Sequence, residues 1–248
     1  AIQRDVISTQ LYAGEPGEPP TANILTGIAA MTSPNTSWEF NLEEAMKILD
    51  EAGWVQSGDV RAKDGVNLEI TFVTSINPVR QKEQAIIKQA LDQLGFRTEL
   101  RQVDAAVYFD GSPGNDQNIN HFYNDLQMYT NNATTPIPTA YMSSWYADAE
   151  GINVAQKSND WSGNNYSRFD NAEYNTLYEQ VRLETDIEKA AEMFIQLKDI
   201  VINEVAVVPI VNRSAGKYGI SSTLYDENVA VSDFEVDYWN IANWNRKA

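Results

Sequence analysis

The sequence predicts an α/β fold, because residues 67–103 have the pattern of a strand, a helix and a second strand. Apolar and polar residues alternate from Leu68 to Val73, which is the two-residue period of a strand. Helical spacing follows, and residues 96–103 continue directly as another strand. The stretch is therefore expected to be a βαβ crossover whose two strands lie parallel in one sheet.

The helix of this unit has clear start and stop signals. Asn77 is a favourable N-cap, and Pro78 at the first helical position loses no hydrogen bond. Gly95 is expected to end the helix. The residues expected on the buried stripe are Ile86, Ile87, Ala90, Leu91 and Leu94, and those expected in solvent are Arg80, Lys82, Glu83, Lys88 and Asp92.

Further elements are expected on both sides of the βαβ unit. The helix that Asn41 opens has two glutamates in its first turn, and its apolar residues are expected to be buried. Asp64-Gly65 is typical of a tight reversal. The other expected helices are 1–12, 139–145, 171–183 and 187–204, and the other expected buried strands are 126–130 and 205–211.

Composition excludes several classes of function. The net charge of −17 repels nucleic-acid backbones and anionic lipid surfaces. The chain has no cysteine, which excludes disulfides and thiolate chemistry, and its one histidine, His121, cannot form a two-histidine zinc site. His121 is expected to be structural, and we predict neither a metal site, a cofactor nor a catalytic residue.

Aromatic and neutral polar residues are concentrated between residues 129 and 166. Flat rings with amide and hydroxyl groups suit stacking against an uncharged polar ligand or a peptide main chain. The alternative is that the rings pack the core and the amides complete loop turns. The residues are Tyr129, Thr130, Asn131, Asn132, Trp145, Tyr146, Trp161, Asn164, Asn165 and Tyr166.

Several strings, in the same order along the chain, resemble the C-terminal half of family 5 extracellular solute-binding proteins, the dipeptide, oligopeptide and nickel receptors of ABC importers. They are Ala1-Ile2-Gln3-Arg4, Glu44-Ala45 to Ala52-Gly53-Trp54, Gln84 to Phe96 and Glu204-Val205-Ala206-Val207-Val208-Pro209. The resemblance implies an α/β second lobe of a type II two-lobe periplasmic-binding-protein-like fold, with a mixed sheet, a βαβ unit and flanking helices.

The resemblance also implies a division of the chain. Residues 1–204 are expected to form the second lobe. Residues 205–248 are expected to return toward the hinge and the first lobe while packing on the same domain. Family members are longer and begin with a signal peptide and usually a lipid-bearing cysteine, so the chain is expected to be a piece that lacks the first lobe.

The same resemblance gives the expected ligand-binding residues. In peptide-binding members a strand ends in Trp, two small residues and an Asp that pairs with the peptide's amino terminus, with Pro four residues later. The matching stretch is Tyr129-Thr130-Asn131-Asn132 with Pro136, so that Asn132 replaces the acid. A neutral amide forms a weaker hydrogen bond to an ammonium group than a carboxylate does. Trp145 and Trp161 are expected as further aromatic contacts.

The resemblance implies a non-enzymatic, monomeric substrate-binding component of an ABC importer. It is expected to capture a peptide or similar polar solute by closure of two lobes and to deliver it to the permease subunits. Its expected location is extracellular or periplasmic, with a lipid anchor in the full-length protein as its only membrane attachment. Two alternatives remain, a glycan-acting hydrolase with paired carboxylates and a surface interaction module.

Overall fold

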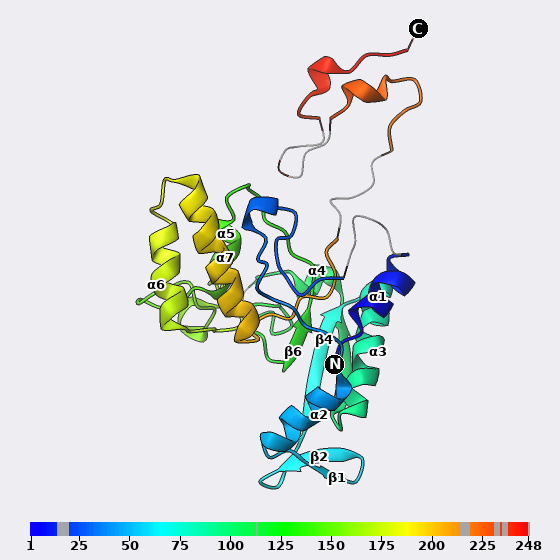
Figure 1. Cartoon of the computed structure of the whole chain (residues 1–248), viewed down its shortest axis with the longest axis vertical. Coiled ribbons are helices and arrows are strands. Elements are labelled where there is room, and N and C mark those ends of the chain that lie inside the picture. Colours follow the sequence, from blue (N-terminus) through cyan, green and yellow to red (C-terminus); the bar gives the residue numbers. More distant parts are fainter. Residues whose placement is uncertain (14–19, 113, 214–218, 231–233, 235–237, 248) are drawn as a thin grey trace.

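The structure is a computed structural model that describes residues 1–13, 20–112, 114–213, 219–230, 234 and 238–247. Two packed regions, one built on a parallel sheet and one built on helices, lie side by side in it (Figure 1). No helix among the described residues combines the length and the apolar character needed to cross a bilayer.

The parallel sheet has the strand order β5-β4-β6. β4 (Glu69–Ser75) pairs with β5 (Arg97–Val103) along its whole length, and its residues 72–74 pair with β6 (Leu126–Met128). Both pairings are parallel, so the predicted βαβ unit is confirmed. The antiparallel strands form a separate small sheet. The sequence predicts one mixed sheet, whereas the structure has one parallel sheet and one antiparallel sheet.

Helix α3 (Pro78–Gln93) connects β4 to β5 and begins where the sequence predicts. Asn77 Oδ1 accepts hydrogen bonds from the backbone N–H groups of residues 79 and 80, at 3.0 and 3.1 Å. Gly95 has a φ of 83°, which favours glycine at the end of the helix. One prediction for this helix was wrong, because Glu83 is only 4% exposed where α1 packs over it.

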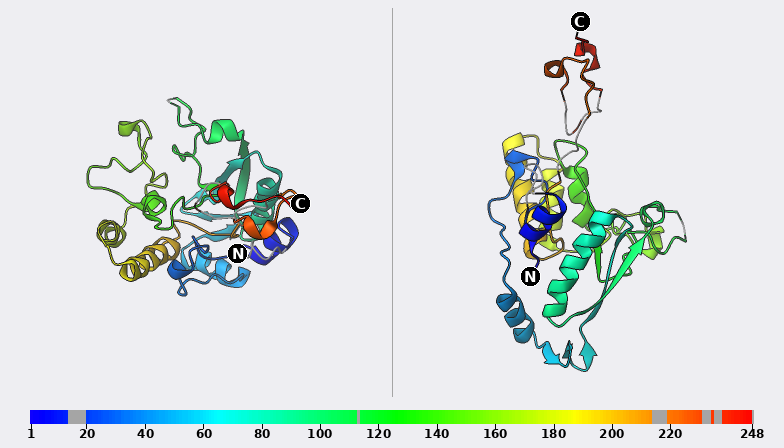
Figure 2. Two further views of the ribbon diagram at one scale, coloured as in Figure 1. Left: turned by 90° about the horizontal axis from the view of Figure 1, so that it is seen from above. Right: turned by 90° about the vertical axis from the view of Figure 1, so that its right-hand side faces the viewer.

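Helix α1 (Arg4–Leu11) lies against α3 (Figures 1 and 2). Ile7 from α1, Phe72 from β4 and Ile87 from α3 are buried together, and we call these three residues the sheet core. The helix predicted for residues 1–12 is therefore confirmed, and it closes one face of the βαβ unit.

The second region is a group of helices, α5 (Thr139–Met142), α6 (Ala172–Val181) and α7 (Ile187–Asn203), with the short helices η1 (Ala29–Met31) and η2 (Ser143–Trp145). Their apolar faces meet in a larger cluster, which we call the helical core. Its buried members are Ile24, Met31, Met142, Trp145, Tyr174, Tyr178, Val181, Ala190, Ala191, Phe194, Leu197, Val201 and Ile202.

Helix α2 (Leu42–Glu51) begins after Asn41, whose side chain accepts a hydrogen bond from the Glu44 N–H at 2.9 Å. The apolar face that the sequence predicts to be buried is only partly covered. None of the helix residues is buried: Ala45, Met46 and Leu49 are half-buried, and Ile48 is 56% exposed. The prediction that Ala45, Met46, Ile48, Leu49 and Ala52 supply a buried face was therefore wrong.

The small antiparallel sheet follows α2, with the order β1 (Val55–Ser57), β2 (Val60–Lys63) and β3 (Val66–Asn67). Asp64 and Gly65 form the predicted reversal between β2 and β3, and both have positive φ angles. Shorter helices complete the described elements: α4 (Ala105–Tyr108), η3 (Lys157–Asn159), η4 (Asp226–Asn228) and η5 (Ile241–Asn243).

Residues 205–211 form an irregular segment rather than the predicted strand. Val205 has a φ of 56°, which turns the chain sharply after α7, and Pro209 has no N–H to donate to a ladder. The segment makes one isolated bridge, between Pro20 and Val211. Its side chains nevertheless contact both cores, since Ala206 and Val207 pack on the helical core and Ile210 packs on the sheet core.

Residues 219–230 and 238–247 lie apart from the two packed regions (Figures 1 and 2). They are joined to each other, because the Tyr225 N–H donates to the Asn245 carbonyl at 3.0 Å and the Lys247 N–H donates to the Thr223 carbonyl at 2.7 Å. The division of the chain into residues 1–204 and 205–248 remains a prediction.

Candidate functional site

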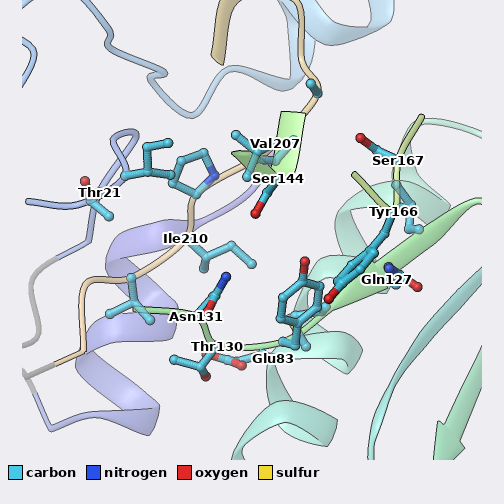
Figure 3. A pocket seen from close by; sticks show the side chains of 18 of the residues that line it. Thr21, Glu83, Gln127, Thr130, Asn131, Ser144, Tyr166, Ser167, Val207 and Ile210 are labelled. Carbon is cyan, nitrogen blue, oxygen red and sulfur yellow. The ribbon is translucent and has the colours of Figure 1, made fainter. Parts of the chain in front are cut away.

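A cavity of about 570 Å³ lies where the sheet region meets the helical region (Figure 3). Residues 129–132, just beyond the carboxyl end of β6, form one of its walls, and residues 205–213 form another. Such a position, outside the carboxyl ends of parallel strands, is where open α/β sheets bind ligands. Figure 3 shows Glu83, Thr130 and Asn131 grouped on one side of the cavity, with Tyr166 and Gln127 on another.

The polar side of the cavity is built around the Thr130 hydroxyl. Arg80 Nη2 donates to Thr130 Oγ1 at 3.0 Å, and Arg213 Nη1 donates to the same oxygen at 3.2 Å. Arg80 Nη1 also donates to Ser75 Oγ at 2.9 Å, which ties the guanidinium to the end of β4. We define the polar side as Arg80, Glu83, Thr130 and Arg213, all of which line the cavity.

Glu83 is the buried acid of this polar side. Its Oε1 accepts a hydrogen bond from the Tyr12 hydroxyl at 2.7 Å. Burial raises the pKa of Glu83, whereas the Tyr12 hydrogen bond and the charges of Arg80 and Arg213 act in the opposite direction. The carboxyl is therefore close enough to both guanidinium groups to interact with them electrostatically.

The aromatic side of the cavity consists of Tyr129, Tyr141, Trp145 and Tyr166. The ring centroids of Tyr141 and Trp145 are 5.7 Å apart. Burial raises the pKa of Tyr129 to about 12 and raises that of Tyr141 further. The hydroxyls are thus neutral near physiological pH and are able both to donate and to accept hydrogen bonds.

Two buried amide oxygens belong to the cavity-lining residues Asn23 and Gln127. Neither Asn23 Oδ1 nor Gln127 Oε1 has a hydrogen-bond partner within the described part of the chain. Buried polar atoms are normally satisfied, so these two oxygens are exceptions among the described residues of the cavity wall.

Residues 1–153, more than half of the chain, match the family model described as the middle part of bacterial extracellular solute-binding proteins, family 5. The chain belongs to this family. The match includes the βαβ unit and the residues 129–132 that line the cavity.

Solved structures of several binding proteins share the fold of this family 5 chain. An oligopeptide-binding protein from Thermus thermophilus, complexed with a pentapeptide, has a TM-score of 0.74 at 22% identity over 86% of the chain. NikZ from Campylobacter jejuni, in complex with Ni(L-His), has a TM-score of 0.72 at 12% identity over 99% of the chain. The oligopeptide-binding protein AppA from Bacillus subtilis, in complex with a nonapeptide, has a TM-score of 0.67 at 18% identity over 99% of the chain.

The family 5 chain spans less than half of these structures, namely 36% of the Thermus protein, 46% of NikZ and 45% of AppA. The fold class expected from the sequence, an α/β lobe of the periplasmic-binding-protein type with a βαβ unit and flanking helices, is confirmed.

Five of the six predicted ligand residues line this one cavity: Tyr129, Thr130, Asn131, Asn132 and Trp145. Asn131 and Asn132 are exposed, Tyr129 and Thr130 are half-buried and Trp145 is 8% exposed. These five residues all lie between positions 129 and 145, so they are also close in the sequence. Their role in binding remains a prediction.

Trp161 lies outside the cavity lining, in an aromatic cluster of its own. Its ring centroid is 4.6 Å from that of His121 and 5.5 Å from that of Tyr123, and the Arg168 guanidinium lies 5.1 Å from the Trp161 centroid. His121 is buried in this cluster, as expected for a structural histidine. In this arrangement Trp161 packs against His121 and Tyr123, which come from a different segment of the chain, rather than against the cavity.

The sequence analysis missed the charged members of the polar side, Arg80, Glu83 and Arg213. Arg80 and Glu83 were assigned to the solvent face of a helix. One usable signal was their place near the amino end of the helix that follows the first parallel strand, because that end of the sheet carries binding sites in α/β folds. Arg213 gave no comparable signal, since it lies 83 residues from Thr130.

Proposed function

We propose that this family 5 chain binds a peptide or similar polar solute in the cavity, as part of the substrate-binding component of an ABC importer. The observation that carries the proposal is the cavity itself, which gathers five of the ligand residues predicted from the sequence at the carboxyl end of a parallel sheet. The solved relatives were captured with a pentapeptide, a nonapeptide and a nickel–histidine complex.

The residues that line the cavity suit a polar solute that also has some apolar surface. The aromatic side supplies rings for stacking, and the neutral hydroxyls and amides supply hydrogen bonds that fix orientation. Asn131 and Asn132 lie exposed at the cavity and carry no charge. Such a surface suits peptide amides or sugar hydroxyls.

Capture by closure of two lobes is part of the proposal. Periplasmic binding proteins enclose their ligands by hinge motion, and a ligand stabilises the closed state only through contacts that it makes there. The solved relatives are more than twice as long as this chain. We propose that the cavity is the part of the cleft that this region contributes, and that permease subunits receive the solute outside the cytoplasmic membrane.

A glycan-acting hydrolase would need two carboxylates at the reacting bond. The cavity lining includes two carboxylates, Glu83 and Asp125, among the described residues. Asp125 Oδ2 already accepts hydrogen bonds from the Thr71 N–H at 2.7 Å and from the Thr71 hydroxyl at 3.0 Å. This engagement favours a binding role without catalysis.

Native mass spectrometry of the protein purified from its host tests the proposal. A transport receptor is expected to retain a small guest, and Trp145→Ala together with Tyr129→Ala should lower the retained fraction. The control is Trp161→Ala, which removes a tryptophan outside the cavity. A protein with no guest that turns over a glycan repeatedly would contradict the proposal, and so would equal loss of the guest from all variants.

A further inference from the structure

We propose that the aromatic side of the cavity is a subsite for a neutral sugar ring of the solute. The inference rests on the proposed function, because it names the chemical class of the polar solute that the same cavity takes. The groups that would bind the sugar are the hydroxyls of Tyr129, Tyr141 and Tyr166, and we call these three residues the tyrosine cluster.

The hydroxyls of the tyrosine cluster are available to a ligand. All three side chains line the cavity, and none of their hydroxyls makes a hydrogen bond to the residues that the structure describes. The side chains are half-buried and their oxygens keep accessible surface, in contrast to the enclosed amide oxygens of Asn23 and Gln127. Figure 3 shows Tyr166 extending into the cavity.

The tyrosines of the helical core are different. The Tyr174 hydroxyl donates to the Met142 carbonyl at 2.5 Å, and the Tyr178 hydroxyl donates to the Thr139 carbonyl at 3.0 Å. Both residues belong to the helical core and lie outside the cavity lining. The hydroxyls that hold this core together therefore have internal partners, whereas the hydroxyls of the tyrosine cluster face the cavity without one.

The three hydroxyls are neighbours, and they are neutral. Tyr166 acts electrostatically on Tyr129, and Tyr129 acts on Tyr141, so Tyr129 lies close to both. Burial is the largest cause that raises the pKa of all three, to about 12 for Tyr129. Each hydroxyl therefore keeps its proton near physiological pH and is able both to donate and to accept a hydrogen bond.

This chemistry suits a sugar better than a peptide main chain. A ligand that displaces water from the cluster has to replace the hydrogen bonds that water makes there. A sugar ring presents several adjacent hydroxyls, each a donor and an acceptor, and its C–H faces pack against aromatic rings such as Trp145. In an extended peptide the N–H only donates, the C=O only accepts, and successive residues direct these groups to opposite sides.

A purely packing role for the tyrosine cluster is the alternative. In that role the rings would fill the cavity wall and the hydroxyls would contact only water. Substitution by phenylalanine separates the two roles, because it removes the hydroxyl and keeps the ring.

Calorimetric titration of the protein as its host produces it tests the proposal. The probes are cellotriose, maltotriose, chitotriose and tetraalanine. We expect at least one trisaccharide to bind at or below millimolar concentration. Tyr141→Phe and Tyr166→Phe should each weaken the binding of that trisaccharide about fivefold, the effect of one lost hydrogen bond, and should leave the binding of tetraalanine unchanged.

Tyr174→Phe is the matched control, because it removes a hydroxyl that has an internal partner and lies outside the cavity lining. It should lower the melting temperature and leave the affinity for the trisaccharide unchanged. Tyr141→Phe and Tyr166→Phe should show the reverse, since their hydroxyls form no hydrogen bond that folding would lose.

Equal trisaccharide affinity in the unaltered protein and in both cavity variants would overturn the subsite. Failure of all three trisaccharides at millimolar concentration would also overturn it. Binding of tetraalanine in that case would favour a peptide as the solute and would leave the proposed function intact. The guest found by native mass spectrometry reports on the proposed function separately.

Discussion

Lys198 in the helical region and Glu83 in the sheet region are both buried ionisable side chains, and their surroundings differ. In the helical region Lys198 is fully buried, and its ammonium donates to the Met31 carbonyl. In the sheet region Glu83 is 4% exposed and lines the cavity beside Arg80 and Arg213. Lys198 is not part of the cavity lining.

The difference separates a structural role from a binding role. Lys198 links α7 to η1 through a main-chain oxygen, which holds two distant segments together. Glu83 lies in a wall that also contains Arg80 and Arg213. The comparison indicates that the helical region keeps its buried charge away from the cavity and contributes aromatic side chains to it, whereas the sheet region provides two of its charged groups.

The prediction with the largest expected effect compares how much a buried phenylalanine stabilises each of the two cores. Phe194 is fully buried in the helical core, whereas Phe72 in the sheet core also lines the cavity. Phe194→Ala should lower the free energy of unfolding by about 5 kcal/mol and Phe72→Ala by about 3 kcal/mol, because the second site already borders open space. Urea denaturation measures both values. A larger loss for Phe72→Ala would reverse the comparison.

The second effect concerns Lys198. Burial lowers its pKa to about 8. The unfolded chain holds this proton more tightly than the folded chain does, so the stability of the protein should rise between about pH 8 and pH 10. Relative to Lys198→Met, the unaltered protein should gain about 2 kcal/mol over this interval.

Urea denaturation at both pH values measures this gain, and the comparison with the variant cancels the titration of tyrosines. Lys189→Met is the control, because Lys189 is exposed on the same helix. Identical pH profiles for the unaltered protein and Lys198→Met would show that Lys198 is not held in a low-dielectric environment.

The third prediction concerns a substitution that adds a negative charge to the cavity lining. Asn132→Asp should increase affinity for trialanine amide over its N-acetylated form by up to about tenfold, since the new carboxylate attracts a free ammonium group. Calorimetry measures the ratio, and Asn203→Asp is an exposed control at the end of α7. An unchanged ratio would place Asn132 away from the amino end of the solute.

The smallest effect concerns Glu83, whose pKa burial raises. The folded chain holds this proton more tightly than the unfolded chain, so stability relative to Glu83→Gln should fall as the pH rises above about 4.5. The hydrogen bond from Tyr12 and the nearby arginines oppose burial and keep this fall small. Thermal unfolding across the acid range measures it, with exposed Glu192→Gln as the control. A rise in relative stability would contradict the assignment.

The parts of the fold that could be predicted from the sequence are those with local causes. Asn41, Asn77 and Asn171 cap helices through their own side chains, and Gly95 ends α3 through its own φ angle. Residues 205–211 have the composition of a strand, but pairing depends on a partner strand, and within the described part of the chain the segment makes one isolated bridge, at Val211. The partial exposure of the apolar face of α2 could not be predicted either, because burial depends on what packs over it.

The same distinction applies to the site. Residues 129–132 are contiguous, so their aromatic and amide character was visible in the sequence. The convergence of Arg80 and Arg213 on Thr130 joins positions 50 and 83 residues away and depends on the folded arrangement. Trp161 shares the composition of the site residues, but loop geometry places it against His121.

The segment 205–211 has a practical consequence. It borders the cavity and contacts both cores, and its one bridge to another described residue is at Val211. Irregular backbone is more accessible to proteases than a paired strand, and Val208 is 41% exposed. A ligand in the cavity would contact this segment. Protection from proteolytic cleavage near Val208 would therefore show, without a labelled ligand, whether the cavity is occupied.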